Sequence, residues 1–281
     1  MELIPLSAAL GVEVRGFDAT KAPTPDELAT LLQAYDEHHL LLIRGQSFEP
    51  PAQEAFVGLF GPLIDDMGNG NRSAFISNIE MIDGGGGSGM LPFHSDLSFT
   101  RSPVHGLALY AVALPEGGTE TLFASSAHAA ATLPPDLRAR VEGRSVHHVL
   151  PVSTNLREFK ARDLDVIGTD PEMLRPALFE HPRNGQEVLY VTDLHAHSIE
   201  GLARDESAQL LDDLFAHLYA DENIYVHHWQ LGDLVVWDNV ALQHARGDVS
   251  QGGERTFRRT SMNEFSVIEL LPALITIGTD S

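Results

Sequence analysis

The sequence contains no cysteine. Its absence excludes disulfide bonds, thiolate-ligated metal sites and a cysteine nucleophile. A chain without cysteine also fits a reducing compartment, and we expect this protein to work in the cytoplasm.

Positively charged residues are scarce. The 281 residues include 18 lysines and arginines against 40 aspartates and glutamates, which gives a formal net charge of -22. A nucleic-acid partner requires clustered basic side chains that neutralise phosphates, so we expect none. The same charge gives no help in attracting an anionic substrate, and a site for an acid must therefore rely on local cations.

Long hydrophobic runs are also missing. The chain has no stretch of about 18 apolar residues, the length that a transmembrane helix needs. Residues 1–6 (MELIPL) lack the basic region with which a signal peptide starts. We therefore expect a soluble protein without a membrane partner, in which 43% hydrophobic residues suffice for a sizeable core.

What the chain does contain is a succession of short strands, with helices mainly near its start and in insertions. Helix patterns occur at 25–38, 51–60, 125–133, 135–142 and 205–220, and strand patterns at 40–43, 73–78, 107–114, 119–123, 146–150, 176–180, 187–192, 224–228, 233–237 and 256–265. Strands and helices do not alternate regularly, which argues against a doubly wound parallel sheet.

These elements predict a mainly β fold with flanking helices, built on a double-stranded β-helix, a jelly roll with a cupin-like core. No repeat or linker divides the chain. We expect a single domain over residues 1–281, with an insertion at about 125–175 and a C-terminal tail from about 266.

The first candidate site lies in FHSDL at residues 93–97. Side chains at positions i and i+2 of an extended strand point the same way, so His94 and Asp96 would chelate one metal ion together. A third ligand must come from another strand, and His244 closely follows the apolar strand at 233–237. Two histidines and one carboxylate leave three positions open, which suits non-haem Fe(II) and O2 chemistry.

A second cluster rivals this site by spacing alone. Asp193, His195 and His197 would share one face of a strand. Other histidines form adjacent pairs whose rings point to opposite faces, and we expect these to be structural or solvent-facing: His38 and His39, His147 and His148, and His227 and His228.

The last predicted strand carries three arginines. By the two-residue repeat of a strand, Arg255, Phe257 and Arg259 share one face, and Arg258 takes the other. If the first face lines a barrel interior, each guanidinium there requires an anion, and its planar fork suits a carboxylate. The alternative is an edge strand whose arginines are solvated.

Together these motifs resemble the taurine/2,4-D dioxygenase (TauD/TfdA-like) family. The resemblance runs from about Leu40 to Phe265 and keeps the family's 11-residue step from the distal histidine to the cofactor arginine. Its elements are His94-x-Asp96, Gly117-Gly118-x-x-Thr121-Leu122, Trp237-Asp238-Asn239, His244, Arg255 and Arg259. The resemblance implies an enzyme that uses Fe(II), 2-oxoglutarate and O2.

The resemblance also implies a role for each matched position. His94, Asp96 and His244 would be the catalytic iron ligands. Thr121 and Arg255 would hold the distal carboxylate of 2-oxoglutarate, whose keto-acid end would chelate the iron.

Substrate contacts follow from the same resemblance. Arg259 lies where family members bind the sulfonate or carboxylate of the substrate. Met90, Phe93 and Phe123 would wall the pocket. His195 falls near a substrate-lining stretch of the phenoxyacetate-degrading branch, which makes its cluster a pocket wall and not a metal site.

Two segments depart from the taurine enzyme of the family. The residues before His94 are apolar where that enzyme has polar substrate-binding groups, and 64–67 (IDDM) is acidic where it has histidines. A larger or more apolar acid, or one with an amine that pairs with an aspartate, fits these changes better than taurine.

The implied reaction is hydroxylation of an unactivated C–H bond in a small organic acid or amino-acid-like substrate, with release of succinate and CO2. An aspartate ligand favours hydroxylation or desaturation over halogenation, in which a halide takes its place. Desaturation or cyclisation by the same machinery stays open. From other classes, so do a zinc hydrolase with the same ligands and a non-catalytic metal-binding barrel.

Two further segments carry expectations. The glycine-rich segment 84–89 is a flexible connection or an active-site lid, because it lacks the Gly-Lys-Ser/Thr ending of a phosphate-binding loop. The apolar stretch 268–275 would pack on another subunit of a homo-oligomer, a dimer or a tetramer.

Overall fold

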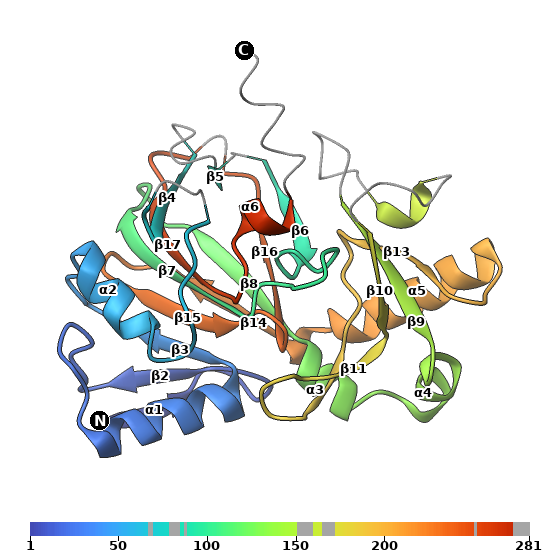
Figure 1. Ribbon diagram of the computed structural model, residues 1–281, viewed down its shortest axis with the longest axis horizontal. Helices are drawn as coiled ribbons and strands as arrows, with labels where there is room; N and C mark the ends of the chain where they lie inside the picture. Colours follow the sequence, from blue (N-terminus) through green and yellow to red (C-terminus); the bar gives the residue numbers. More distant parts are fainter. Residues whose placement is uncertain are drawn as a thin grey trace, which may run out of the picture.

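The structure is a computed structural model that describes residues 1–66, 70–78, 85–86, 89–150, 160–164, 172–249 and 252–271. It is mostly β with few helices, as predicted. Figure 1 shows two sheets with the first helices on the left and centre, and a separate lobe of helices and short strands on the right. Within the described ranges, no helix has both the length and the apolar character needed to cross a bilayer.

The larger sheet has eight strands in the order β1-β2-β3-β15-β7-β17-β4-β5. These are β1 (Glu2–Pro5), β2 (Val12–Arg15), β3 (Leu40–Ile43), β4 (Ser73–Ser77), β5 (Gly85–Gly86), β7 (Gly106–Ala113), β15 (Leu234–Asp238) and β17 (Thr256–Met262). Pairing is antiparallel except between β2 and β3 and between β4 and β5. β3 and β15 are buried at every position, because both faces of the sheet are covered at its centre.

The smaller sheet has four antiparallel strands in the order β14-β8-β16-β6. These are β6 (Leu91–His94), β8 (Glu120–Ser125), β14 (Ile224–His228) and β16 (Leu242–Arg246). Side chains of both sheets meet in one hydrophobic cluster, in which Phe123 of β8 packs edge-on against Trp237 of β15 at 5.3 Å. The two sheets therefore enclose a common core.

Helices α1 (Pro25–His38) and α2 (Pro50–Val57) cover the outer face of the larger sheet (Figure 1). The predicted helix at 25–38 is confirmed, because Thr24 and Glu27 form the expected capping box. Leu31 of α1 and Phe56 of α2 pack with Leu41 of β3 in a second cluster.

The lobe on the right of Figure 1 is the chain between β8 and β14. Its elements are α3 (Ser126–Ala131), α4 (Pro135–Val141), β9 (Ser145–Val149), η1 (Ala161–Asp163), β10 (Glu172–Pro176), β11 (Leu178–Glu180), β12 (Glu187–Leu189), β13 (Ala196–Ile199), α5 (Arg204–Leu218) and η2 (Asp221–Asn223). The lobe has its own hydrophobic cluster and extends well past residue 175. The short α6 (Val267–Leu270) follows β17, and residues 272–281 of the expected tail lie outside the described residues.

Asp238 closes the turn between β15 and β16. Its Oδ1 accepts hydrogen bonds from the backbone N–H groups of Val240 and Ala241, at 2.9 and 3.0 Å, and lies 3.0 Å from His181 Nε2. Burial raises the pKa of Asp238, but His181 and the backbone donors outweigh it and hold the pKa below its usual range. The ionised carboxylate therefore stabilises the folded state.

Replacing Asp238 by alanine is expected to lower the free energy of unfolding by about 2–4 kcal/mol at pH 7, since each buried donor without an acceptor costs about 1–3 kcal/mol. A depressed pKa means that the carboxylate stabilises the fold above the unfolded-state pKa of about 3.9 and less as the pH falls further. The difference between the two proteins should therefore narrow below about pH 4. Urea unfolding of both proteins at pH 7 and below pH 4 measures this difference in the free energy of unfolding.

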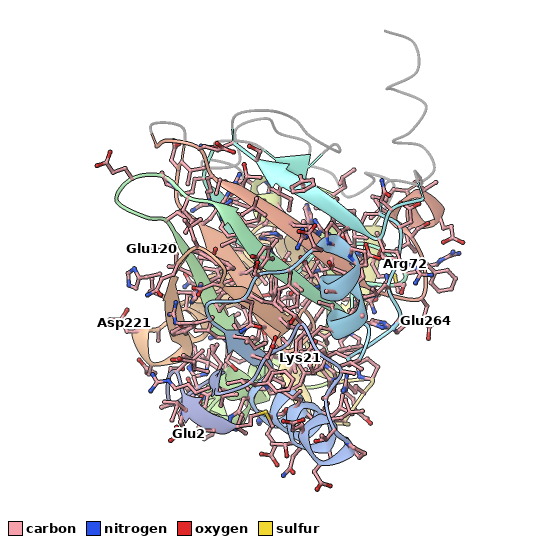
Figure 2. The ribbon with its side chains drawn as sticks, turned by 90° about the vertical axis from the view of Figure 1, so that its left-hand side faces the viewer. Glu2, Lys21, Arg72, Glu120, Asp221 and Glu264 are labelled. Atoms are coloured by element: carbon pink, nitrogen blue, oxygen red, sulfur yellow. The ribbon has the colours of Figure 1, made fainter. Side chains whose placement is uncertain are left out.

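The matched control is alanine at Asp221, an exposed residue of η2 (Figure 2). Its unfolding midpoint should equal that of the wild type. Equal midpoints for the wild type and Asp238→Ala would show that the turn does not depend on this carboxylate.

Candidate metal centre

His94, Asp96 and His244 converge on one point. His94 Nε2 lies 3.1 Å and His244 Nε2 lies 3.8 Å from Asp96 Oδ1. One donor atom from each residue lies within 4.8 Å of the other two, and the described part of the chain holds no other such group of three His, Cys, Asp or Glu. The structure thus brings together the three residues that the sequence proposed as metal ligands.

The two histidines meet because their strands pair. β6 and β16 are antiparallel neighbours, with His94 directly opposite His244. Directly opposed side chains share one face of a sheet, and the two ring centroids lie 4.2 Å apart. The sequence did not predict β16 as a strand, so this register was not foreseen.

Asp96 reaches the site by an unexpected route. β6 ends at His94, and Asp96 lies in a turn in which Leu97 has a φ of 58°. Asn239 holds this turn: its side chain accepts a hydrogen bond from Asp96 N at 3.0 Å and donates one to Asp96 O at 3.2 Å. The extended conformation expected for residues 94–96 is therefore wrong, although the two side chains still meet.

Hydrogen bonds and neighbouring charges orient and tune these three side chains. His94 Nδ1 lies 2.9 Å from the carbonyl of Pro92, which can only accept, so Nδ1 carries the proton and Nε2 keeps its lone pair. Burial and the neighbouring His94 lower the pKa of His244 to about 3. Burial raises the pKa of Asp96, but Arg259 and the two histidines outweigh it and lower the pKa below its usual range. Two imidazoles thus face one anionic carboxylate.

The rival cluster is dispersed. Asp193 forms an ion pair with Arg162 at 2.8 Å. His197 Nε2 lies 3.2 Å from the carbonyl of Leu164. His195 lies apart from both and packs against the metal site, and the three do not form a metal-binding group within the described residues.

A cavity of about 170 Å³ adjoins the three ligands. Its other lining residues are Ile76, Leu91, Leu109, Thr121, Ala245, Arg246, Arg255 and Arg259. Three guanidinium groups thus surround a cavity in which Asp96 is the one carboxylate among the described lining residues. This local positive charge suits anionic ligands in spite of the acidic chain as a whole.

Arg255 is 4% exposed, and no described carboxylate pairs with it. Its Nε donates to Thr119 Oγ1 at 3.2 Å, and its guanidinium lies over the ring of Phe257 at 4.3 Å. Burial and the nearby Arg246 lower the pKa of Arg255 to about 9. The Nη1 and Nη2 end of the guanidinium has no hydrogen-bond partner among the described residues, so it can take a carboxylate bidentately.

Thr121 lies in the same cavity wall. Its Oγ1 accepts a hydrogen bond from the indole Nε1–H of Trp229 at 2.9 Å. Because a hydroxyl has one proton to donate, this contact leaves the O–H of Thr121 available as a donor to an anion. Thr121 and Arg255 therefore both offer donors to the same cavity.

Arg259 faces the metal ligands from β17. Its Nη2 lies 3.1 Å from Asp96 Oδ2, and its Nε donates to Ser261 Oγ at 3.0 Å. Burial would lower the pKa of Arg259, but Asp66 and Asp96 outweigh it and raise the pKa above its usual range. Arg259 is thus a cation on the cavity wall that contacts Asp96, one of the proposed metal ligands.

Two aromatic residues expected in the substrate pocket lie elsewhere. Phe93 alternates with His94 along β6, so its ring points away and stacks on Tyr219 at 4.4 Å. Phe123 is fully buried against Trp237 in the core between the sheets. Neither belongs to the described lining of the cavity, which corrects both expectations.

The other two expected substrate residues lie near the site. Met90 is partly buried and directly precedes Leu91, which lines the cavity. His195 is buried, and its ring lies 6.2 Å from that of His94 and 4.9 Å from that of Phe99. It therefore packs next to His94, one of the three proposed metal ligands.

Some residues of the site were not predicted. Arg246 lines the cavity, and its position two residues after His244 on β16 was the available signal. Tyr219 stacks on Phe93 and donates a hydrogen bond to Gln243 Oε1 at 2.7 Å. Tyr219 thus contacts the chain neighbours of two proposed metal ligands, His94 and His244, and no local sequence signal reveals this.

Comparison with known proteins gives a consistent result. Residues 2–261 match the model of the "Taurine catabolism dioxygenase TauD, TfdA family". The chain is 28% identical over 287 residues to an alpha-ketoglutarate-dependent 2,4-dichlorophenoxyacetate dioxygenase of Cupriavidus pinatubonensis, covering 94% of this chain and 98% of the relative. It is 31% identical over 284 residues to a pentalenolactone F synthase of Streptomyces arenae, covering 92% and 94%.

Solved structures are similar over the same length. A taurine dioxygenase from Burkholderia xenovorans superposes with a TM-score of 0.77 and 26% identity, covering 93% of this chain and 90% of that one. AAD-2 in complex with Mn(II) and N-oxalylglycine superposes with a TM-score of 0.75 and 27% identity, covering 94% and 97%.

Proposed function

The chain belongs to the taurine catabolism dioxygenase TauD, TfdA family, and from that premise we propose how its own residues carry out the reaction. It is a 2-oxoglutarate-dependent dioxygenase that oxidises a small organic substrate. The reaction we propose is hydroxylation of an unactivated C–H bond in an organic acid or amino-acid-like molecule, with release of succinate and CO2. When bound, Fe(II) supplies the redox chemistry that couples O2 and 2-oxoglutarate to this oxidation.

His94, Asp96 and His244 would hold the Fe(II). The donor set fits this ion, because two imidazoles and one carboxylate leave coordination positions for 2-oxoglutarate and O2. The hydrogen bond from His94 Nδ1 to Pro92 O fixes the ring so that Nε2 faces the site. The ring of Trp237 packs on His244 at 5.1 Å and limits its rotation.

Arg255 and Thr121 would bind the distal carboxylate of 2-oxoglutarate. The observation that carries this proposal is the buried Arg255 without a described carboxylate partner, in the same cavity as the three ligands. A buried cation is stable when it is paired, and a co-substrate carboxylate would supply the pair. Thr121 adds the one O–H donor that Trp229 leaves available.

The substrate would bind on the Arg259 side of the cavity. Arg259 Nη1 has no hydrogen-bond partner among the described residues and would donate to the acid group of the substrate. Met90 and His195 lie near this region, next to a lining residue and behind His94 respectively. Phe93 and Phe123 would support the site by packing against Tyr219 and Trp237 and would not line the cavity.

We further infer that the eight-stranded and four-stranded sheets are the two walls of a double-stranded β-helix, and that residues 1–281 form one domain. The shared hydrophobic core between the sheets supports this. The enzyme would act in the cytoplasm as a homo-oligomer, a dimer or a tetramer, for which the absence of cysteine and the apolar stretch 268–275 are the support. Residues 272–275 of that stretch and residues 84, 87 and 88 of the proposed lid lie outside the described residues.

The test is spectroscopic. Under anaerobic conditions, Fe(II) and 2-oxoglutarate added to the protein should produce a visible charge-transfer band, and Zn(II) in place of Fe(II) should produce none. In air, a panel of organic acids, sulfonates and amino-acid derivatives should include compounds that increase succinate release. A protein that gives neither the band nor succinate would refute the proposed function.

A further inference from the structure

Asp66 lies beside Arg259, although the sequence suggested an aspartate of the segment 64–67 only as a partner for a substrate amine. Its Oδ2 accepts a hydrogen bond from Ser261 Oγ at 2.6 Å and lies 3.5 Å from Arg259 Nε. Ser261 Oγ in turn accepts from Arg259 Nε at 3.0 Å. A carboxylate, a hydroxyl and a guanidinium thus form one connected chain of charge-assisted contacts.

This chain of contacts ends on a metal ligand. Arg259 Nη2 lies 3.1 Å from Asp96 Oδ2, while the other oxygen, Oδ1, lies 3.1 Å from His94 Nε2. The two oxygens of Asp96 are therefore distinguished: one contacts the guanidinium and the other faces the donor atoms of the histidines. A carboxylate held in this way binds a metal through one oxygen, which keeps the remaining positions open.

The backbone fixes Asp66 relative to β17. Ile64 N donates to Ser261 O at 3.1 Å, and Leu63 forms a bridge with Met262. The side chains of Asp66, Arg259 and Asp96 are 14%, 24% and 16% exposed. Solvent screens these partly buried contacts less than it screens surface ion pairs. They can therefore keep Arg259 and Asp96 in one orientation.

Charge gives a second reason for Asp66. A guanidinium close to the ligand cluster repels a divalent cation, and this repulsion would weaken metal binding. Asp66 offsets the charge of Arg259, so that the charge of Asp96 remains available to the metal. The Oδ1 of Asp66 has no described hydrogen-bond partner, and no other described cation forms an ion pair with this carboxylate.

We propose that Asp66 and Ser261 are positioning residues that hold Arg259 against Asp96 and so direct one oxygen of Asp96 toward the metal. The inference rests on the proposed function in one respect, namely that His94, Asp96 and His244 bind the metal ion. Asp66 acts through Arg259 and contacts neither metal nor substrate.

The test measures metal binding without turnover. Mn(II), a redox-inert stand-in for Fe(II), is titrated into the protein and followed by electron paramagnetic resonance. Asp66→Asn keeps the shape and an acceptor for Ser261 but removes the charge, and its Kd for Mn(II) should rise about 10-fold, the lower end of the effect of residues that support a metal ligand. Ser261→Ala, a second variant in case the first does not fold, should also raise the Kd.

Asp65→Asn is the matched control. Asp65 is the neighbour in the chain, and its Oδ2 accepts a hydrogen bond from Gly70 N, whereas the described ion pairs of Arg259 are with Asp66 and Asp96. Its Kd should remain within about twofold of the wild type, because surface changes away from a site have little effect. Circular dichroism and the Tm establish that each variant is folded.

A merely structural role of Asp66 would lower the Tm and leave the Kd unchanged. A role through Arg259 predicts that Asp66→Asn has little further effect on the Kd once Arg259→Gln has removed the guanidinium. Wild-type Mn(II) affinity in both Asp66→Asn and Ser261→Ala would overturn this inference and leave the proposed metal site in place. A wild-type protein that binds no Mn(II) would overturn the proposed metal site and this inference with it.

Discussion

Replacing Asp96 by alanine is expected to lower substrate-dependent succinate formation by about 1,000-fold or more, because a catalytic metal contributes several kcal/mol and each tenfold in rate corresponds to about 1.4 kcal/mol. Asp96 is the one carboxylate among the three proposed ligands. Its removal also leaves Arg259, now without that contact, facing the metal position. Mn(II) affinity should therefore fall together with turnover.

The control for Asp96→Ala is the same substitution at Asp193, which belongs to the cluster that rivals the site by spacing. Asp193 pairs with Arg162 and takes no part in the group of ligands. Asp193→Ala should keep Mn(II) binding even if it loses some stability. If turnover survives Asp96→Ala, or if only Asp193→Ala loses metal binding, the metal site would instead be the cluster of Asp193, His195 and His197.

The arrangement of the arginines could be predicted from the sequence because Arg258 and Arg259 lie on β17 and Arg255 directly precedes it. The two-residue repeat placed Arg255 and Arg259 on one face and Arg258 on the other, and this is what the structure has. A register shift near Thr256 leaves the pattern intact. Local periodicity suffices where one element carries all the side chains concerned.

The geometry of the proposed metal ligands was harder to predict from the sequence, because it depends on contacts between distant segments. Asp96 was expected on an extended strand, yet a hydrogen-bonded turn with Leu97 at positive φ presents it to the site. Asn239, 143 residues away, holds that turn. The three side chains converge as proposed, but the local conformation differs from the expected one, because no local pattern encodes a contact of such separation.

The substrate side was predicted least well. Phe93 and Phe123 were assigned to the pocket from their positions beside the motif residues, but the pleat turns Phe93 toward Tyr219 and the register places Phe123 beneath Trp237. Asp66 comes from a loop whose approach to β17 depends on tertiary packing. Such residues follow from the pairing of sheets and loops, which composition and periodicity do not determine.

Replacing Arg255 by glutamine should weaken 2-oxoglutarate binding by about 100-fold, since truncating one partner of a buried, hydrogen-bonded charge pair costs about 2–5 kcal/mol and about 1.4 kcal/mol is tenfold. Glutamine cannot offer the bidentate fork that Arg255 turns toward the cavity. Mn(II) affinity without 2-oxoglutarate should change little, because Arg255 contacts none of the three ligands. Titration of the charge-transfer band with 2-oxoglutarate measures the Kd, and the KM should rise in parallel.

Arg258→Gln separates this effect from general damage to β17. Arg258 is also buried, but it points to the opposite face, where it donates to Gln53 Oε1 and to the carbonyl of Phe48, both at 2.7 Å. Its loss should lower the Tm and leave the Kd for 2-oxoglutarate unchanged, whereas Arg255→Gln should raise the Kd and affect the Tm less, because removing a buried cation without a described carboxylate partner relieves a desolvation cost. The reverse result would mean that the anion enters from the other face of the strand and that Arg255 serves the fold.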